Sequence, residues 1–197
     1  MITERYQALS AEVGPEVTVV VATKYVPSDA MDRLLDAGVT TVGENRLQDL
    51  EQKHQRWGEH FTWHFIGHLQ SRKAPAVSSL VELVHSLDSQ GAARRLSVPA
   101  LVQVNLAGET SKSGVAPSDL EDFVATATAA GVEIRGLTTM PPLTTDPEDS
   151  ARYFARLASL ASALNLTCLS MGTSQDYRVA VREGATHIRV GSALFAR

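Results

Sequence analysis

The sequence predicts a parallel (β/α)8 barrel, and two observations lead to that fold. Eight short runs rich in Val, Ile and Thr alternate with segments whose apolar residues recur at helical spacing. Within the runs, polar and apolar residues alternate little, as in parallel strands that are buried on both faces. Eight strands, each followed by a crossover, make the strand count of a (β/α)8 barrel. An open doubly wound sheet is the alternative fold with the same alternation.

The expected elements fill residues 1–197 as a single domain. Strands are expected at residues 17–23, 40–43, 62–66, 83–86, 100–105, 133–138, 167–170 and 187–190. Helices are expected at residues 3–13, 28–37, 45–57, 71–79, 88–95, 117–130, 147–164 and 174–183. Ser28 is a typical helix start, and Gly38, Gly131 and Gly184 are typical residues just past a helix end. The chain is short for this fold, so its helices must be short as well.

Composition excludes several classes of protein. The net charge of −4 argues against a surface for nucleic acid or anionic membranes, which needs clustered Lys and Arg. A single cysteine allows no internal disulfide. No apolar run reaches the roughly 18 residues of a membrane span, and the charged first residues do not form a signal peptide. We therefore expect a cytoplasmic protein. We also expect a monomer.

Lys24 ends the apolar run VTVVVATK, where an ammonium group is costly to take out of water. A strand-end lysine that reaches solvent is the ordinary explanation. However, Lys24 shares period-two parity with Thr18, Val20 and Ala22, so these side chains can lie on one face of the strand. If that face is the barrel interior, Lys24 points into the mouth of the barrel. Partial desolvation there turns a lysine amine into a Schiff-base nucleophile toward an aldehyde.

Two loops rich in small residues follow the last two expected strands. The segment SMGTSQDY carries Thr173 and Ser174, and the segment RVGSALF carries Gly191 and Ser192. In these barrels the loops after the seventh and eighth strands often bind phosphate, because small residues expose backbone N–H groups. One such loop alone is typical of a helix cap. Both together indicate a phosphate site.

A lysine opposite a phosphate site fits a ligand with an aldehyde and a phosphate. Pyridoxal 5′-phosphate (PLP) is one such ligand, and a phosphorylated sugar handled by an aldolase is the other. Arg189 lies two residues before Gly191, within reach of the ring nitrogen of a pyridoxal group. A permanently cationic arginine cannot keep that nitrogen protonated, which makes the ring a weaker electron sink. An ion pair with Glu183 is the alternative role for Arg189.

Four histidines, at positions 54, 60, 64 and 68, fall in one short region and raise the question of a metal site. His64 and His68 flank a strand end, so they do not share a helical face as paired ligands would. No cysteine or clear carboxylate completes the set. We expect no bound metal.

Seven segments follow one another from about residue 17 to residue 195: VVVATK, VGENRLQDL, WHFIGHLQSRK, VHSLDS, LVQVNLAGETSKSGV, GLTTMPP and LSMGTSQDYRVAVREGATHIRVGSALF. In this order they resemble the YggS/PROSC family of pyridoxal-phosphate homeostasis proteins. The resemblance covers nearly the whole chain. The set of segments is highly specific, although each piece alone is not.

This resemblance implies a (β/α)8 barrel like the N-terminal domain of alanine racemase, with PLP as cofactor. Lys24 matches the Schiff-base lysine, and Arg189 matches the arginine near the pyridine nitrogen. The other matching positions are Thr173, Ser174, Gly191 and Ser192 for the phosphate, and Asn45 and Met140 for the ring. The family is regarded as a carrier and regulator of the cofactor without established enzyme activity. PLP and PLP-dependent apoenzymes are the implied partners.

The chain departs from the family pattern at a few positions. Thr138 and Thr173 stand where methionine is common, which polarises the lining of the site. Residues 88–99 form a shorter stretch than usual, which bears on surface helices and partner contacts.

Two enzymatic alternatives remain. A PLP-dependent amino-acid racemase needs a second acid/base group, generally a tyrosine from a second domain, and Tyr25 lies on the opposite face of its strand from Lys24. A Schiff-base aldolase acting on a phosphosugar is the less favoured alternative.

Overall fold

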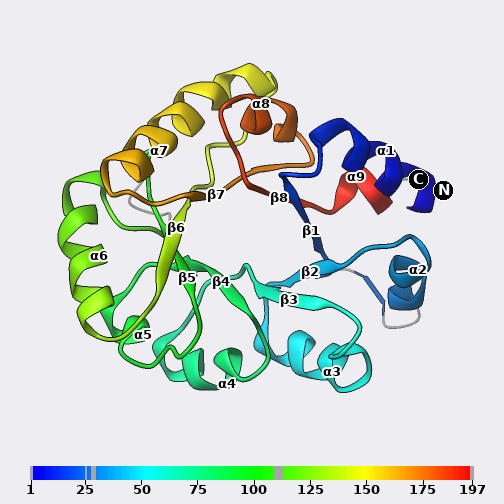
Figure 1. Ribbon diagram of the computed structural model, residues 1–197, viewed down its shortest axis with the longest axis horizontal. Helices are drawn as coiled ribbons and strands as arrows, with labels where there is room; N and C mark the ends of the chain where they lie inside the picture. Colours follow the sequence, from blue (N-terminus) through cyan, green and yellow to red (C-terminus); the bar gives the residue numbers. More distant parts are fainter. Residues whose placement is uncertain (1, 25, 28–29, 109–112, 196–197) are drawn as a thin grey trace.

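Eight parallel strands close into one barrel in the computed structural model, which describes residues 2–24, 26–27, 30–108 and 113–195. Each strand pairs with the next, and β8 pairs with β1, while the helices form an outer ring (Figure 1). The strands are β1 (Thr18–Ala22), β2 (Thr41–Glu44), β3 (Thr62–Phe65), β4 (Leu83–Leu87), β5 (Ala100–Gln103), β6 (Ile134–Thr138), β7 (Cys168–Thr173) and β8 (His187–Val190). The prediction of a (β/α)8 barrel is confirmed, and the open doubly wound sheet is wrong.

Helices α2 to α8 lie between the strands in the order that the sequence predicts, whereas α1 precedes β1 and α9 follows β8. The helices are α1 (Ile2–Val13), α2 (Met31–Asp36), α3 (Leu47–Trp57), α4 (Ala74–Ser78), α5 (Gln90–Ala93), α6 (Leu120–Ala129), α7 (Ala151–Ala163), α8 (Tyr177–Arg182) and α9 (Ser192–Phe195). Short 3₁₀ turns precede three of them: η2 (Ser71–Lys73), η3 (Pro117–Asp119) and η4 (Pro147–Ser150). None of the helices in these described ranges is long and apolar enough to cross a membrane.

The main apolar core lies between the barrel and its helices. Trp63 and Phe65 of β3 are buried in this layer, together with Phe154 and Leu157 of α7. His64, between the two aromatic residues, points to the opposite face of the strand and lies within the barrel. Because successive side chains of a strand point to opposite faces, apolar side chains lie under the helices and several polar side chains lie inside the barrel.

Three element boundaries differ from the sequence prediction for local reasons. The helix expected from residue 45 begins at Leu47, because Arg46 keeps an extended backbone with φ −128° and ψ 134°. The helix expected from residue 174 begins at Tyr177, because Asp176 Oδ1 accepts hydrogen bonds from the Thr173 N–H and hydroxyl and holds a turn there. The helix expected at residues 88–95 contracts to α5, and the start expected at Ser28 lies outside the described residues.

The barrel closes between its first and last strands. Val20 of β1 lies beside Arg189 of β8, and Val21 lies beside Val190. Outside this closure α1 and α9 run next to each other (Figure 1), and the Arg5 guanidinium donates to the Leu194 carbonyl oxygen across 3.1 Å. The strand that precedes Lys24 and the strand that carries Arg189 are therefore direct neighbours, although they are remote in sequence.

Candidate cofactor site at the mouth of the barrel

A cavity of about 590 Å³ opens at the carboxyl end of the barrel. Its lining includes all the residues that the sequence predicts for cofactor binding: Lys24, Asn45, Met140, Thr173, Ser174, Arg189, Gly191 and Ser192. They come from the ends of five different strands, β1, β2, β6, β7 and β8. The barrel fold therefore gathers the predicted residues at one edge, as parallel strands do at their carboxyl ends.

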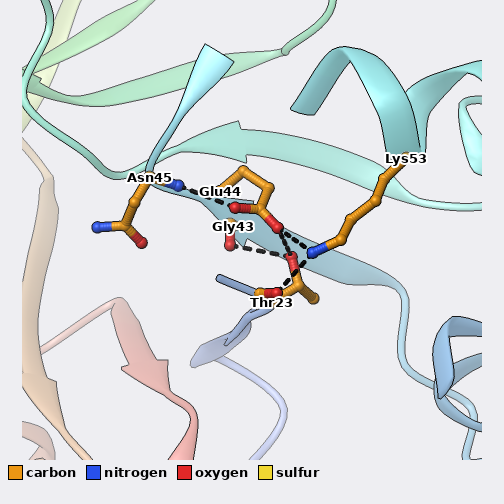
Figure 2. Close-up of polar contacts among 5 residues, drawn as sticks. All are labelled: Thr23, Gly43, Glu44, Asn45 and Lys53. Carbon is orange, nitrogen blue, oxygen red and sulfur yellow. Dashed lines mark hydrogen bonds and ion pairs between the residues drawn. The ribbon is translucent and has the colours of Figure 1, made fainter. Parts of the chain in front are cut away.

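A buried polar cluster supports the strand end that carries Lys24 (Figure 2). Lys53 of α3 donates to the Thr23 carbonyl oxygen across 2.6 Å and pairs with Glu44 Oε1. The Thr23 hydroxyl also donates to Glu44 Oε1, across 2.7 Å. Thr23, Glu44 and Lys53 are all buried, whereas Lys24 itself is exposed at the cavity. The cluster thus holds the backbone just before the predicted Schiff-base lysine.

Asn45 is held by the same cluster and offers an acceptor at the cavity. Its backbone N–H donates to Glu44 Oε2 across 3.1 Å. Its side-chain oxygen is buried and has no hydrogen-bond partner among the described residues. A buried acceptor of this kind is costly unless a ligand or a water donates to it. Gly67 lies so close that a Cβ there would come within 2.0 Å of the Asn45 carbonyl oxygen, so a larger residue would displace Asn45.

Arg189 is buried on the other side of the cavity and is held by neutral acceptors. Its Nη1 donates to Thr138 Oγ1 and to the Ser170 carbonyl oxygen, both across 2.8 Å, and also to the Ser170 hydroxyl. Its Nη2 donates to the Thr139 carbonyl oxygen across 3.0 Å. Burial lowers the pKa of the guanidinium to about 10, partly opposed by the nearby Asp176 carboxylate. Arg189 forms no ion pair with a described carboxylate.

The ion pair between Arg189 and Glu183 that sequence spacing allowed is wrong. Glu183 pairs instead with Arg182 of α8, across 3.3 Å. Arg189 points into the barrel because it has the same parity on β8 as His187, whose ring also lies inside. A buried cation without a carboxylate partner is typical of a binding site for an anion or an acceptor.

Thr138 and Thr173, the two positions that depart from the family pattern, both form side-chain hydrogen bonds near the cavity. Thr138 is buried, accepts from Arg189 and donates to the Ser170 carbonyl oxygen across 2.7 Å. Thr173 lines the cavity, but its N–H and hydroxyl both donate to Asp176 Oδ1. Met140, which is 49% exposed, forms the rim and accepts from Arg189 Nη2 through its sulfur. Thr138 is thus part of the support of Arg189, a role that sequence reasoning missed.

Donor groups converge at the loops after β7 and β8. Ser174 Oγ accepts from the N–H groups of Gly191 and Ala193, across 3.1 and 3.0 Å. Because it accepts both bonds, its own proton remains to be donated toward the cavity. Ser192 is exposed at the start of α9. The hydroxyl groups of Ser174 and Ser192 suit a phosphate group, whereas the N–H groups of Gly191 and Ala193 are already bonded to Ser174 Oγ. With Lys24 on the opposite side, the residues present fit both ends of PLP.

The four histidines of the short region do not converge. His54 packs against Trp63 on the outside of the barrel, with ring centroids 5.7 Å apart, and His60 is exposed. His68 lies at the surface, 3.6 Å from Asp88, while His64 points into the barrel. Across the parts of the chain that the structure covers, no group of three His, Cys, Asp or Glu side chains could hold a metal ion.

Comparisons with known proteins agree with this site. The family model described as alanine racemase, N-terminal domain, matches residues 2–197. The pyridoxal phosphate homeostasis protein of Aquifex aeolicus is 37% identical over 191 residues, which cover 88% of this chain and 84% of the relative. The chain belongs to the family of pyridoxal phosphate homeostasis proteins. The resemblance inferred from the seven sequence segments is confirmed.

Solved structures of the family share the whole fold. PipY of Synechococcus elongatus without PLP superposes with a TM-score of 0.92 and 34% identity, and each chain covers all of the other. The PipY structure with PLP bound gives a TM-score of 0.91 and 33% identity over the same extent. This family relationship covers the complete barrel and all the strands that line the cavity.

Sequence reasoning missed the residues that do not line the cavity but hold its lining residues in place. Glu44 appears in the GENR segment, but nothing in the sequence pairs it with Lys53. Ser170 and His85 both point into the barrel. Ser170 lies beside Thr138 on the neighbouring strand, and His85 has the same parity on β4 as Leu83. These relations become visible only when the register between the strands is known. A search for polar residues at inward strand positions would have found them.

Proposed function

We propose that this protein binds PLP as a Schiff base on Lys24 and acts in intracellular PLP homeostasis as a carrier or regulator. The single observation that carries the proposal is the cavity, which combines an exposed lysine, a buried arginine and the hydroxyl groups of Ser174 and Ser192. Membership of the homeostasis family, and the PipY structure with PLP bound, support the choice of ligand. When bound, PLP supplies an aldehyde that reacts with an amine.

Each side of the cavity has its own task. Lys24 supplies the amine, and the cluster of Thr23, Glu44 and Lys53 fixes the backbone that carries it. Ser174 and Ser192 hold the phosphate by hydrogen bonds from their hydroxyl groups, and the Gly191 N–H positions Ser174. Asn45 accepts a hydrogen bond through its otherwise unpartnered oxygen, while Met140 covers the rim. Arg189 donates to the ring nitrogen.

The same residues favour binding without robust turnover. Arginine donates a hydrogen bond but does not supply a proton to the ring nitrogen, so it leaves the ring a weak electron sink. No tyrosine occurs among the described residues that line the cavity, and a two-base racemase needs such a group near the lysine. Tyr25 lies outside the described residues. We accordingly propose a non-catalytic role, in the cytoplasm, for a monomeric single domain (residues 1–197) that exchanges PLP with PLP-dependent apoenzymes.

Absorbance spectroscopy of the purified protein tests the proposal. We expect a visible absorbance band, and borohydride reduction should fix the cofactor on the peptide that contains Lys24. Lys24→Ala should lose both signals, whereas Lys73→Ala, remote from the cavity, should keep them. A Lys24→Ala protein with the wild-type visible band would show that another residue carries the Schiff base. Conversion of L- to D-alanine above the background of free PLP would instead favour the racemase.

A further inference from the structure

The interior of the barrel below the cavity contains a chain of polar side chains. Ser170 of β7 and the rings of His64 on β3 and His85 on β4 are buried there. The centroids of the two imidazole rings are 4.9 Å apart, and the ring of His187 lies 6.0 Å from that of His64. Apolar side chains usually fill this space in such barrels, so a polar chain here calls for an explanation.

The polar chain begins at Arg189 and crosses the barrel. The Ser170 hydroxyl accepts a hydrogen bond from Arg189 Nη1 and lies 2.7 Å from His85 Nδ1. His85 Nε2 lies in turn 2.9 Å from His64 Nδ1. One continuous series of hydrogen bonds thus joins the buried guanidinium to two histidines on the far wall.

Arg189 determines the direction of every proton in this series. A guanidinium only donates, so the Ser170 oxygen must accept from it. Ser170 is fully buried, and its hydroxyl has only Arg189 and His85 as described partners, so its proton must go to His85 Nδ1. His85 then carries its own proton on Nε2 and donates to His64 Nδ1. His64 therefore also carries its proton on Nε2.

Both imidazoles are neutral in this arrangement. Burial lowers the pKa of His85 well below its ordinary value, and the neighbouring His64 and Arg189 lower it further. The pKa of His64 falls to about 3, chiefly through burial and also through His187. A carboxylate in the place of His85 would neutralise the charge of Arg189. Neutral acceptors hold the guanidinium in position and leave its charge for the cavity.

We propose that Ser170, His85 and His64 form a positioning relay, with both histidines in the Nε2–H tautomer, that orients Arg189 toward the ligand. The relay deepens the proposed function, because the ligand that Arg189 meets there is PLP. The three residues touch no ligand themselves and act only through Arg189. Both ring nitrogens of His85 are engaged in hydrogen bonds within the relay.

Nitrogen NMR of the apoprotein tests the relay without PLP. Protein labelled with ¹⁵N-histidine should show, at neutral pH, a protonated Nε2 and an unprotonated Nδ1 for both His85 and His64. His64→Gln and His85→Gln assign the two signals, and glutamine keeps one acceptor and one donor at each position. An Nδ1–H tautomer or a cationic ring at either position would overturn the relay. Because the measurement needs no ligand, a wild-type protein that failed to bind PLP would refute the proposed function and leave this test intact.

A pair of serine variants tests the positioning role. Ser170→Ala removes the link between Arg189 and His85, and we expect about tenfold weaker PLP binding with a shifted visible absorbance maximum. Ser170→Thr keeps the hydroxyl and should retain the wild-type affinity and spectrum. A purely structural role for Ser170 would lower the thermal stability of the Ser170→Ala apoprotein while its PLP affinity and spectrum stayed as in the wild type. That outcome would contradict the relay.

Discussion

The ammonium of Lys53 and the carboxylate of Glu44 form a 2.5 Å ion pair that is nearly closed to water, with side-chain exposures of 7% and 0%. The pair binds the ends of β1 and β2 together, since Lys53 also donates to the Thr23 carbonyl oxygen and Glu44 accepts from the Asn45 N–H (Figure 2). Both cavity residues that follow, Lys24 and Asn45, therefore depend on it for their backbone positions.

Removal of one partner of this pair should destabilise the fold strongly. Lys53→Met leaves the buried Glu44 charge uncompensated, and we expect a loss of about 3–5 kcal/mol in the free energy of unfolding, measured by urea denaturation. The double variant Lys53→Met/Glu44→Gln removes both charges and should recover part of that loss. Glu133→Gln, which breaks the exposed pair with Arg135, should keep the wild-type midpoint. Equal stability of Lys53→Met and the wild type would mean that the buried pair contributes nothing.

The buried histidines should make the protein sensitive to mild acid. The pKa values of His64 and His187 are lowered to about 3 and about 4, mainly by burial, so the folded state stays unprotonated where the unfolded chain takes up protons. The contribution of these neutral histidines to the free energy of unfolding is fully present above pH 6.5. It is lost as the pH falls below 6.5 toward the folded-state pKa, at about 1.4 kcal/mol per pH unit for a histidine such as His64. Urea denaturation between pH 7 and pH 5 measures this slope.

Two variants separate titration from packing in that experiment. His64→Gln removes one buried titrating group and should flatten the slope of stability against pH. Ser170→Ala disturbs the same chain of hydrogen bonds without removing a titrating group, so it should lower stability and keep the slope. An unchanged slope in His64→Gln would show that His64 does not titrate as its burial implies.

Ser174 should contribute to PLP binding through the phosphate alone. Its hydroxyl accepts from the N–H groups of Gly191 and Ala193 and has its proton left for an anion. Ser174→Ala should weaken PLP binding about tenfold and leave binding of pyridoxal, which lacks the phosphate, close to the wild type. Fluorescence titration with both ligands measures the ratio. Ser159→Ala on α7 is the control, and a parallel loss of both affinities in Ser174→Ala would place the phosphate elsewhere.

Gly67 should be required for the position of Asn45. A Cβ at residue 67 would lie 2.0 Å from the Asn45 carbonyl oxygen, so Gly67→Ala must shift the end of β2. We expect about 1–3 kcal/mol lower stability together with weaker PLP binding. In Gly91→Ala the nearest atom is the Ser71 hydroxyl oxygen, which can rotate away, so PLP affinity should be kept. Wild-type affinity in Gly67→Ala would show that the backbone at Asn45 has room to adapt.

Strand order and site position were predictable from the sequence because both depend on local patterns. Lys24 follows from parity along one strand, and Arg189 follows from its place two residues before Gly191. The loop residues around Ser174 follow from small residues ahead of helices. The support of Arg189 was not predictable in the same way. Its contacts with Thr138 and Ser170 depend on how three strands align in register, which no single segment encodes.

Side-chain competition explains the remaining differences. Thr173 belongs to the predicted phosphate loop, yet its N–H and hydroxyl both donate to Asp176 Oδ1. This contact depends on the turn at residues 173–176, which the sequence analysis did not predict. Lys53 looks like one of several charged residues on the polar helix α3. Its burial against Glu44 becomes visible only when α3 packs on β2.

The closure between β1 and β8 gives the cavity an unusual relation to the assembly of the chain. Lys24 follows the first strand of the barrel and Gly191 follows the last, and these two strands pair directly. A ligand bound both to Lys24 and to the loop at Gly191 would connect the ends of β1 and β8, the pair of strands that closes the barrel. During synthesis the cavity cannot form until β8 has been made. Ligand binding would then slow the exchange of backbone amide hydrogens along the β1–β8 pairing. Release of the bound molecule would return amide exchange along the β1–β8 pairing to the rate of the empty barrel.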